Sequence, residues 1–157
     1  MQITSAMKMV SAAKLKKAQD AITAMRPYSN KLSELMQSFS GGSGGGDKSF
    51  TENRILKKVL VVVISSNRGL CGAFNANIAK EALVFKSKEK FSESKIDFLT
   101  IGKKINDTLS KTETIIQNNS DVFDDLNYEN VGKIADELMS RFISNDYDHI
   151  EIIYNSF

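Results

Sequence analysis

A long N-terminal helix is the feature that most constrains this chain. Residues 1–39 are rich in Ala, Lys, Met, Leu and Gln and contain no glycine, which favours a single helix of about 55 Å. Apolar side chains recur along it with a 4-3-4 spacing, an eleven-residue repeat, at Ile3, Met7, Val10, Ala18, Ala21 and Met25, with Lys14 between them. Pro27 removes a backbone donor and crowds the preceding turn, so we expect a kink near it.

The chain is predicted to divide into a stalk helix at 1–39, a flexible glycine-rich linker at 40–54 and a globular domain at 55–157. Strand and helix signals alternate in the third part, which is typical of Rossmann-like βαβ units. We therefore expect an α/β fold, a mostly parallel sheet flanked by helices. The predicted strands are 59–65, 96–101, 113–117 and 150–154, and the predicted helices are 73–90, 103–109 and 129–142. The first of these helices should present one apolar face, made of Phe74, Ile78, Ala82 and Phe85.

The apolar stripe of residues 1–39 has no evident partner in the chain, because the other predicted helices are needed to cover the sheet. A long apolar stripe left in water is a docking face, so we expect a partner helix or some self-association of this chain. Residues 1–39 carry six lysine and arginine side chains against two carboxylates, whereas the remainder has a slight excess of carboxylates. The helix is therefore a separate basic unit that would favour an acidic partner, a nucleic acid or an anionic membrane surface.

The sharpest candidate for chemistry is the glycine-containing loop at 65–75, between a predicted strand and a predicted helix. Such loops are common ligand sites in α/β sheets. This one matches neither the G-x-x-x-x-G-K-[ST] nor the G-x-G-x-x-G phosphate fingerprint. Gly69 and Gly72 then permit a tight turn with Arg68 exposed, suited to a protein contact. A phosphate- or nucleotide-binding α/β module that uses this loop is the alternative.

The other residues offer no catalytic constellation. The single cysteine and single histidine, Cys71 and His149, cannot form a Cys/His zinc site. The carboxylates ahead of the helix at 129–142 are interpreted as favourable to the helix dipole rather than as metal ligands: Asp121, Asp124, Asp125 and Glu129. The basic helix lacks the aromatic side chains of single-strand binders. We expect an interaction protein with no catalytic residue, metal, cofactor or nucleic-acid partner.

Four segments resemble the gamma subunit of F-type ATP synthase, in the expected order and separation: residues 2–15, Arg26-Pro27-Tyr28, residues 65–75 and Tyr154-Asn155-Ser156-Phe157. The resemblance implies a non-catalytic rotor. In this family proton flow turns a membrane c-ring, the ring turns gamma, and gamma forces the catalytic beta subunits through different nucleotide affinities. The implied partners are the alpha, beta and epsilon subunits and the c-ring, at the cytoplasmic face of the bacterial inner membrane.

The resemblance also implies site residues by position. One group matches the coiled-coil segment that passes between the beta subunits: Met7, Lys8, Met9, Val10 and Lys14. The other matches the loop that faces an acidic segment of beta, with Arg68 as the charge contact: Arg68, Gly69, Leu70, Cys71 and Gly72. Family members extend further at both ends, and their C-terminal helix winds antiparallel with the N-terminal helix. The resemblance thus implies a truncated chain whose long helix is half of an antiparallel coiled coil.

Overall fold

The computed structural model describes residues 2–40, 50 and 54–156. The chain forms two compact units, Met1–Thr51 and Glu52–Phe157. The linker that we expect at 40–54 lies largely outside the described residues, although Ser40 still belongs to the first helix. Among the described residues, no helix has both the length and the apolar character needed to cross a membrane.

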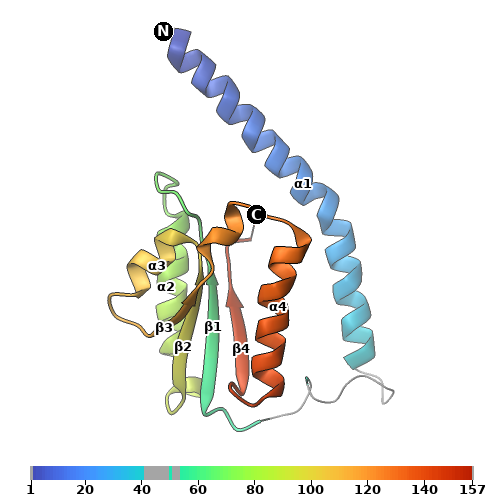
Figure 1. Cartoon of the computed structure of the whole chain (residues 1–157), viewed down its shortest axis with the longest axis vertical. Coiled ribbons are helices and arrows are strands. Elements are labelled where there is room, and N and C mark those ends of the chain that lie inside the picture. The colour runs from blue at the N-terminus through green and yellow to red at the C-terminus, as the bar shows by residue number, and fades with distance from the viewer. Residues whose placement is uncertain (1, 41–49, 51–53, 157) are drawn as a thin grey trace. The chain divides into compact units, whose positions relative to one another are not determined.

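The first unit is dominated by α1, Gln2–Ser40, whose 39 residues confirm the predicted long helix. Pro27 lies inside it, and its axis changes direction partway along (Figure 1). Proline commonly causes such bends, because it lacks the amide that the helix would use. The side chains described along α1 are exposed, with Gln19 alone partly buried. The apolar stripe is therefore uncovered throughout the described part of α1.

The second unit confirms the α/β prediction (Figure 1). Its strands are β1 Lys58–Ile64, β2 Lys95–Ile101, β3 Ile115–Asn118 and β4 His149–Ile153. They form a four-stranded sheet in the order β3-β2-β1-β4, and every neighbouring pair is parallel. The connecting helices are α2 Phe74–Lys86, α3 Lys103–Leu109 and α4 Tyr128–Ile143, with single 3-10 turns at Glu89–Phe91 and Ser120–Phe123.

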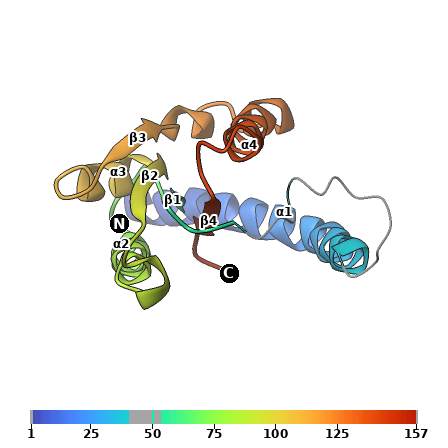
Figure 2. The ribbon, with the colours of Figure 1, turned by 90° about the horizontal axis from the view of Figure 1, so that it is seen from below.

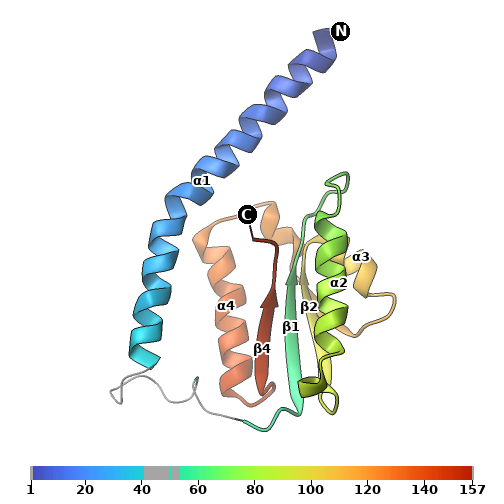
Figure 3. The same cartoon turned by 180° about the vertical axis from the view of Figure 1, so that it is seen from behind.

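The core has two halves because β1 is apolar and buried at every position from Val59 to Val63. Figures 2 and 3 show α2 and α4 on opposite faces of the sheet. The half beneath α2 and α3 gathers Val59, Val61, Val63, Ile78, Ala82, Phe85, Phe91, Phe98, Ile105, Leu109 and Ile153. The half on the α4 side gathers Leu60, Val62, Leu99 and Tyr147, with Leu138 of α4 packed against it.

The helix predicted at 73–90 is shorter than expected. α2 ends at Lys86, because Lys88 adopts an extended conformation, with φ −66° and ψ 133°. The chain then turns Phe91 back onto Phe85, with ring centroids 4.5 Å apart. Ile78, Ala82 and Phe85 are buried as predicted, but Phe74 is 41% exposed. It occupies the first turn of α2, and the buried part of the helix face begins with Ile78.

The ends of β1 and β2 approach closely where Gly102 meets Ser65. A Cβ on Gly102 would lie 2.5 Å from the carbonyl oxygen of Ser65, and the φ of Gly102 is 123°. The approach lets the Ser65 amide donate to the Ile101 carbonyl at 2.8 Å. It also lets Ser65 Oγ accept from the Ile105 amide at 3.1 Å. Glycine is therefore required at this turn.

We expect Gly102→Ala to lower the free energy of unfolding by about 2–4 kcal/mol, because it adds both a steric clash and backbone strain. The matched control is Gly132→Ala in α4, where an added Cβ meets nothing within 4 Å. That variant should gain about 0.5–1 kcal/mol from helix propensity. Urea unfolding of both variants checks the pair, and a Gly102→Ala midpoint equal to that of the parent would contradict the close approach.

A buried polar pair lies in the α4-side half of the core. The Tyr147 hydroxyl donates to Asp97 Oδ2 at 3.1 Å, and Lys95 Nζ is 3.3 Å from the same oxygen. Burial, reinforced by the neighbouring Asp97 charge, raises the pKa of Tyr147 to about 12. The folded domain therefore favours the neutral phenol.

Domain stability should consequently depend on Tyr147 at alkaline pH. The pKa of Tyr147 is raised from 10.0 to about 12 on folding, so its contribution is complete below pH 10 and is lost as the pH rises toward 12. Tyr147→Phe should show a smaller alkaline loss of stability than the parent. Tyr154→Phe, at a site 64% exposed, is the control. Urea unfolding from pH 8 to 11.5 measures both, and parallel curves for parent and Tyr147→Phe would refute the assignment.

Candidate functional site

The loop between β1 and α2 leaves the carboxyl edge of the sheet, where β1 ends at Ile64. Ser65 is still buried, and the residues from Arg68 to Phe74 are exposed. Two loop residues adopt left-handed backbone conformations: Leu70, with φ 59°, and Gly72, with φ 60°. Glycine adopts this conformation without strain, whereas leucine does so at a cost. The loop therefore holds a defined shape while standing clear of the core.

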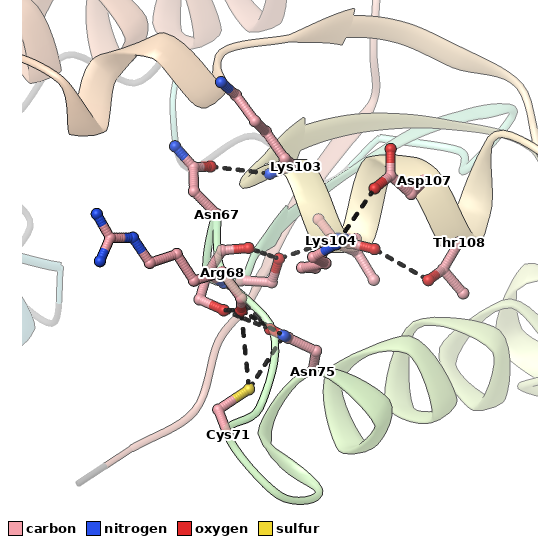
Figure 4. A network of polar contacts seen from close by, with 11 residues as sticks. Asn67, Arg68, Cys71, Asn75, Lys103, Lys104, Asp107 and Thr108 are labelled. Carbon is pink, nitrogen blue, oxygen red and sulfur yellow. Dashed lines mark hydrogen bonds and ion pairs between the residues drawn. The ribbon is translucent and has the colours of Figure 1, made fainter. Parts of the chain in front are cut away.

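Asn75, in the first turn of α2, organises this loop (Figure 4). Its Oδ1 accepts from the Ser66 amide at 3.2 Å. Its Nδ2 lies within donating distance of the Arg68 carbonyl, at 3.2 Å, and of Cys71 Sγ, at 3.1 Å. From the far side, Asn155 Nδ2 donates to the Phe74 carbonyl at 3.0 Å. The side-chain amide of Asn75, which is partly buried, thus connects Ser66, before the exposed segment, with Arg68 and Cys71 inside it.

Asn67 joins the loop to the turn that follows β2. Its Oδ1 accepts from the Lys103 amide at 2.9 Å, and its Nδ2 donates to the Ser120 carbonyl at 3.1 Å. The Lys104 amide donates to the Ser66 carbonyl at 3.2 Å. Three connections at the carboxyl edge, after β1, β2 and β3, are therefore held together by backbone and side-chain hydrogen bonds.

These hydrogen bonds use several backbone amides at this edge of the sheet. The amides of Ser66, Lys103, Lys104 and Ile105 all donate to acceptors within the domain. The Gly102 amide donates to Ser120 Oγ at 3.2 Å. A phosphate-binding loop instead leaves such donors directed at its ligand. The amides at the base of the loop and in the turn after β2 are therefore engaged within the domain.

The exposed face of the loop combines a cation with an apolar side chain. Leu70 is fully exposed, and Arg68, Gly69, Cys71 and Gly72 are exposed around it. An arginine beside a fully exposed apolar side chain suits a protein contact, because arginine is enriched at interfaces and among their hot spots. The Cys71 thiol is free and exposed, and it lies against Asn75.

The predicted site residues fall into two groups in the structure. The loop residues Arg68–Gly72 lie together in one segment, as expected. The helix residues lie on α1 in the other unit and are all exposed: Met7, Lys8, Met9, Val10 and Lys14. Asn67 and Lys103 were missed, since hydrogen bonding across connections is not visible in a single sequence. Their only signal was a polar residue two positions after the end of each of two predicted strands.

The remaining candidate residues have structural roles. The α4 helix begins with Asn127, whose side chain accepts from the Asn130 amide at 2.8 Å. His149 Nε2 lies 3.0 Å from Glu151 on β4. Within residues 2–40, 50 and 54–156, no group of three or more His, Cys, Asp or Glu side chains could hold a metal ion.

Comparison with known proteins finds relatives along the whole chain. A family model described as ATP synthase matches residues 1–157. The ATP synthase gamma chain of Flavobacterium psychrophilum is 60% identical over 161 residues, which cover all of this chain and 54% of that protein. The gamma chain of Christiangramia forsetii is 53% identical, over 100% of this chain and 55% of its own length. The gamma chain of Geobacter sp. (strain M21) is 39% identical, over 99% of this chain and 54% of its own length. The chain spans about half the length of the curated relatives it matches.

We expect Asn75→Ala to loosen the β1–α2 loop without unfolding the domain, because its amide holds both the Ser66 N–H and the Arg68 carbonyl. Loss of one hydrogen bond should speed exchange of the Ser66 amide proton by about fivefold to tenfold. Asn77→Ala, at an exposed position of the same helix, is the matched control. Hydrogen exchange followed by NMR measures both, and equal Ser66 rates would exclude this role for Asn75.

Proposed function

The chain belongs to the family of ATP synthase gamma chains, and we propose that its residues form part of the central-stalk rotor of an F-type ATP synthase. The family match over residues 1–157 carries this proposal. Because the chain spans about half the length of its relatives, the activity is proposed for the full-length protein that contains it. In that protein these residues bind no substrate and catalyse no step; they transmit rotation to the catalytic subunits.

The exposed stripe of α1 supports this proposal for the first unit. Met7 is 65% exposed and Val10 is 57% exposed, although both are apolar. An antiparallel helix from the full-length protein would cover such a stripe and form a coiled coil with α1. The alpha and beta subunits would then surround the pair, with Met7, Lys8, Met9, Val10 and Lys14 at the contact. The stiffness of a continuous helix pair would allow torque to pass along it.

The fixed loop of the second unit supports a separate contact. Arg68 is exposed beside the fully exposed Leu70, and Asn75 restrains the backbone of both flanks. An acidic segment of the beta subunit offers the complementary charge for Arg68 and, at its apolar positions, a surface for Leu70. A restrained loop suits this task because little conformational entropy is lost on each engagement. Gly69, Cys71 and Gly72 complete the contact.

The proposal also names the remaining partners and the location. The epsilon subunit and the membrane c-ring would bind the same rotor. The domain would therefore lie at the cytoplasmic face of a bacterial inner membrane, attached through the complex. No cofactor enters the proposed role.

Native mass spectrometry of the full-length protein, tagged and gently purified from its own cells, tests the proposal. One copy travelling with the alpha and beta subunits of the hexamer is expected. A protein that travels alone with a bound nucleotide would overturn the rotor assignment and return the 65–75 loop to consideration as a ligand site.

We expect Met7→Lys in the assembled complex to reduce ATP synthesis at least several-fold relative to ATP hydrolysis, because it introduces a charge into a closely packed contact. Met7→Leu is the matched control, since it keeps the apolar character and approximate volume of the side chain. Both activities are measured in sealed membrane vesicles. An unchanged ratio in Met7→Lys, with normal assembly, would contradict the proposed contact at this position.

A further inference from the structure

Lys103, the first residue of α3, lies beside the proposed contact loop but belongs to a different connection of the sheet. Its backbone amide donates to Asn67 Oδ1 at 2.9 Å, and Asn67 directly precedes Arg68. One hydrogen bond therefore fixes the backbone that carries Lys103 to the backbone that carries Arg68. Figure 4 shows the Lys103 and Arg68 side chains both extending away from α3.

The sheet places the two connections that carry these charges next to each other. β1 and β2 pair in parallel with Ile64 opposite Ile101, so the two connections leave the same edge from neighbouring strands. Neighbouring strands are about 4.8 Å apart, so the two connections begin close together. The Gly102 turn against Ser65 then directs the chain into α3 and leaves Lys103 exposed.

The charges around Lys103 leave its ammonium group available. Its neighbour Lys104 is engaged with Asp107, at 3.9 Å. The first acidic residue of the connection after β3 is Asp121, and the ion pairs of the described residues do not include one between Lys103 and Asp121. Across the part of the chain that the structure describes, neither Arg68 nor Lys103 has an ion-pair partner.

We propose that Lys103 is a second charge contact of the rotor loop, which binds a carboxylate in the same acidic segment of the beta subunit that faces Arg68. This inference rests on the proposed function. Two cations held by different connections would recognise a segment with at least two carboxylates, whereas Arg68 alone would accept a single one. The second charge thus adds selectivity for a segment with several carboxylates. Its effect on the rate of association weakens as the salt concentration increases.

Zero-length carbodiimide cross-linking of the assembled complex tests the contact directly, because it joins a lysine amine to a carboxylate only where the two touch. Peptide mass spectrometry should find Lys103 joined to an Asp or Glu of the beta subunit. Lys111, an exposed lysine beyond the other end of α3, is the internal control and should give no such product. Lys103→Arg should lose the cross-link but keep normal coupling, since guanidinium retains the charge without forming the amide.

Charge reversal supplies the functional comparison. Lys103→Glu and Arg68→Glu should each lower the ratio of ATP synthesis to hydrolysis by about twofold to fivefold, as expected for exposed ion pairs. Lys111→Glu should leave it unchanged. If Arg68→Glu lowers the ratio while Lys103→Glu does not and Lys103 gives no cross-link to beta, the inference is wrong and the proposed function stands. Cross-linking of Lys103 to a different subunit would also overturn the inference. If the protein does not purify with beta at all, the proposed function itself fails.

Discussion

The second unit depends on one strand that is buried on both faces. Every residue from Val59 to Val63 is almost completely inaccessible, so β1 must lie between neighbouring strands and between two layers of helix. Parallel pairing on both sides follows, with β2 and β4 as its neighbours. Because parallel strands end at a common edge, the connections after β1, β2 and β3 are brought together there. The loop that concerns function is thus placed by the burial of five consecutive apolar side chains.

At that edge, several backbone amides and carbonyls form hydrogen bonds within the domain. Asn67, Asn75 and Ser120 supply side-chain partners to amides and carbonyls of adjoining connections. The same position in a nucleotide-binding α/β domain presents free amides to phosphate. Here the amides of Ser66, Gly102 and Lys103 are occupied, while Arg68 and Leu70 are exposed. An exposed arginine and an exposed leucine on this loop agree with the protein contact that we propose.

Most of the fold could be predicted from the sequence because it depends on periodicity. The continuous apolar run of β1 and the glycine-free first 39 residues gave strong signals, and α3 matched its prediction at both ends. The end of α2 could not be predicted, because the extended conformation of Lys88 reflects the packing of Phe91 on Phe85. The exposure of Phe74 was missed for a related reason. Helical spacing predicts which residues share one face of the helix, but it does not predict how far along that face the sheet covers them. The role of Asn67 could not be predicted either, because its hydrogen-bond partners lie 36 and 53 positions away in the sequence.

The two units meet opposite physical requirements. The sheet domain buries its own core, so its loop can be held in a strained conformation at Leu70 and presented without collapse. α1 has no core within its described residues, and most of the stability of helices in proteins comes from packing of an apolar face rather than from local propensity. Its order in the working protein would therefore depend on a partner helix, so formation of the shaft and assembly would be one thermodynamic event. Under the proposed function, this coupling would allow a stiff rotor shaft to exist only inside the complex, while the pre-formed loop would be ready for contact before assembly.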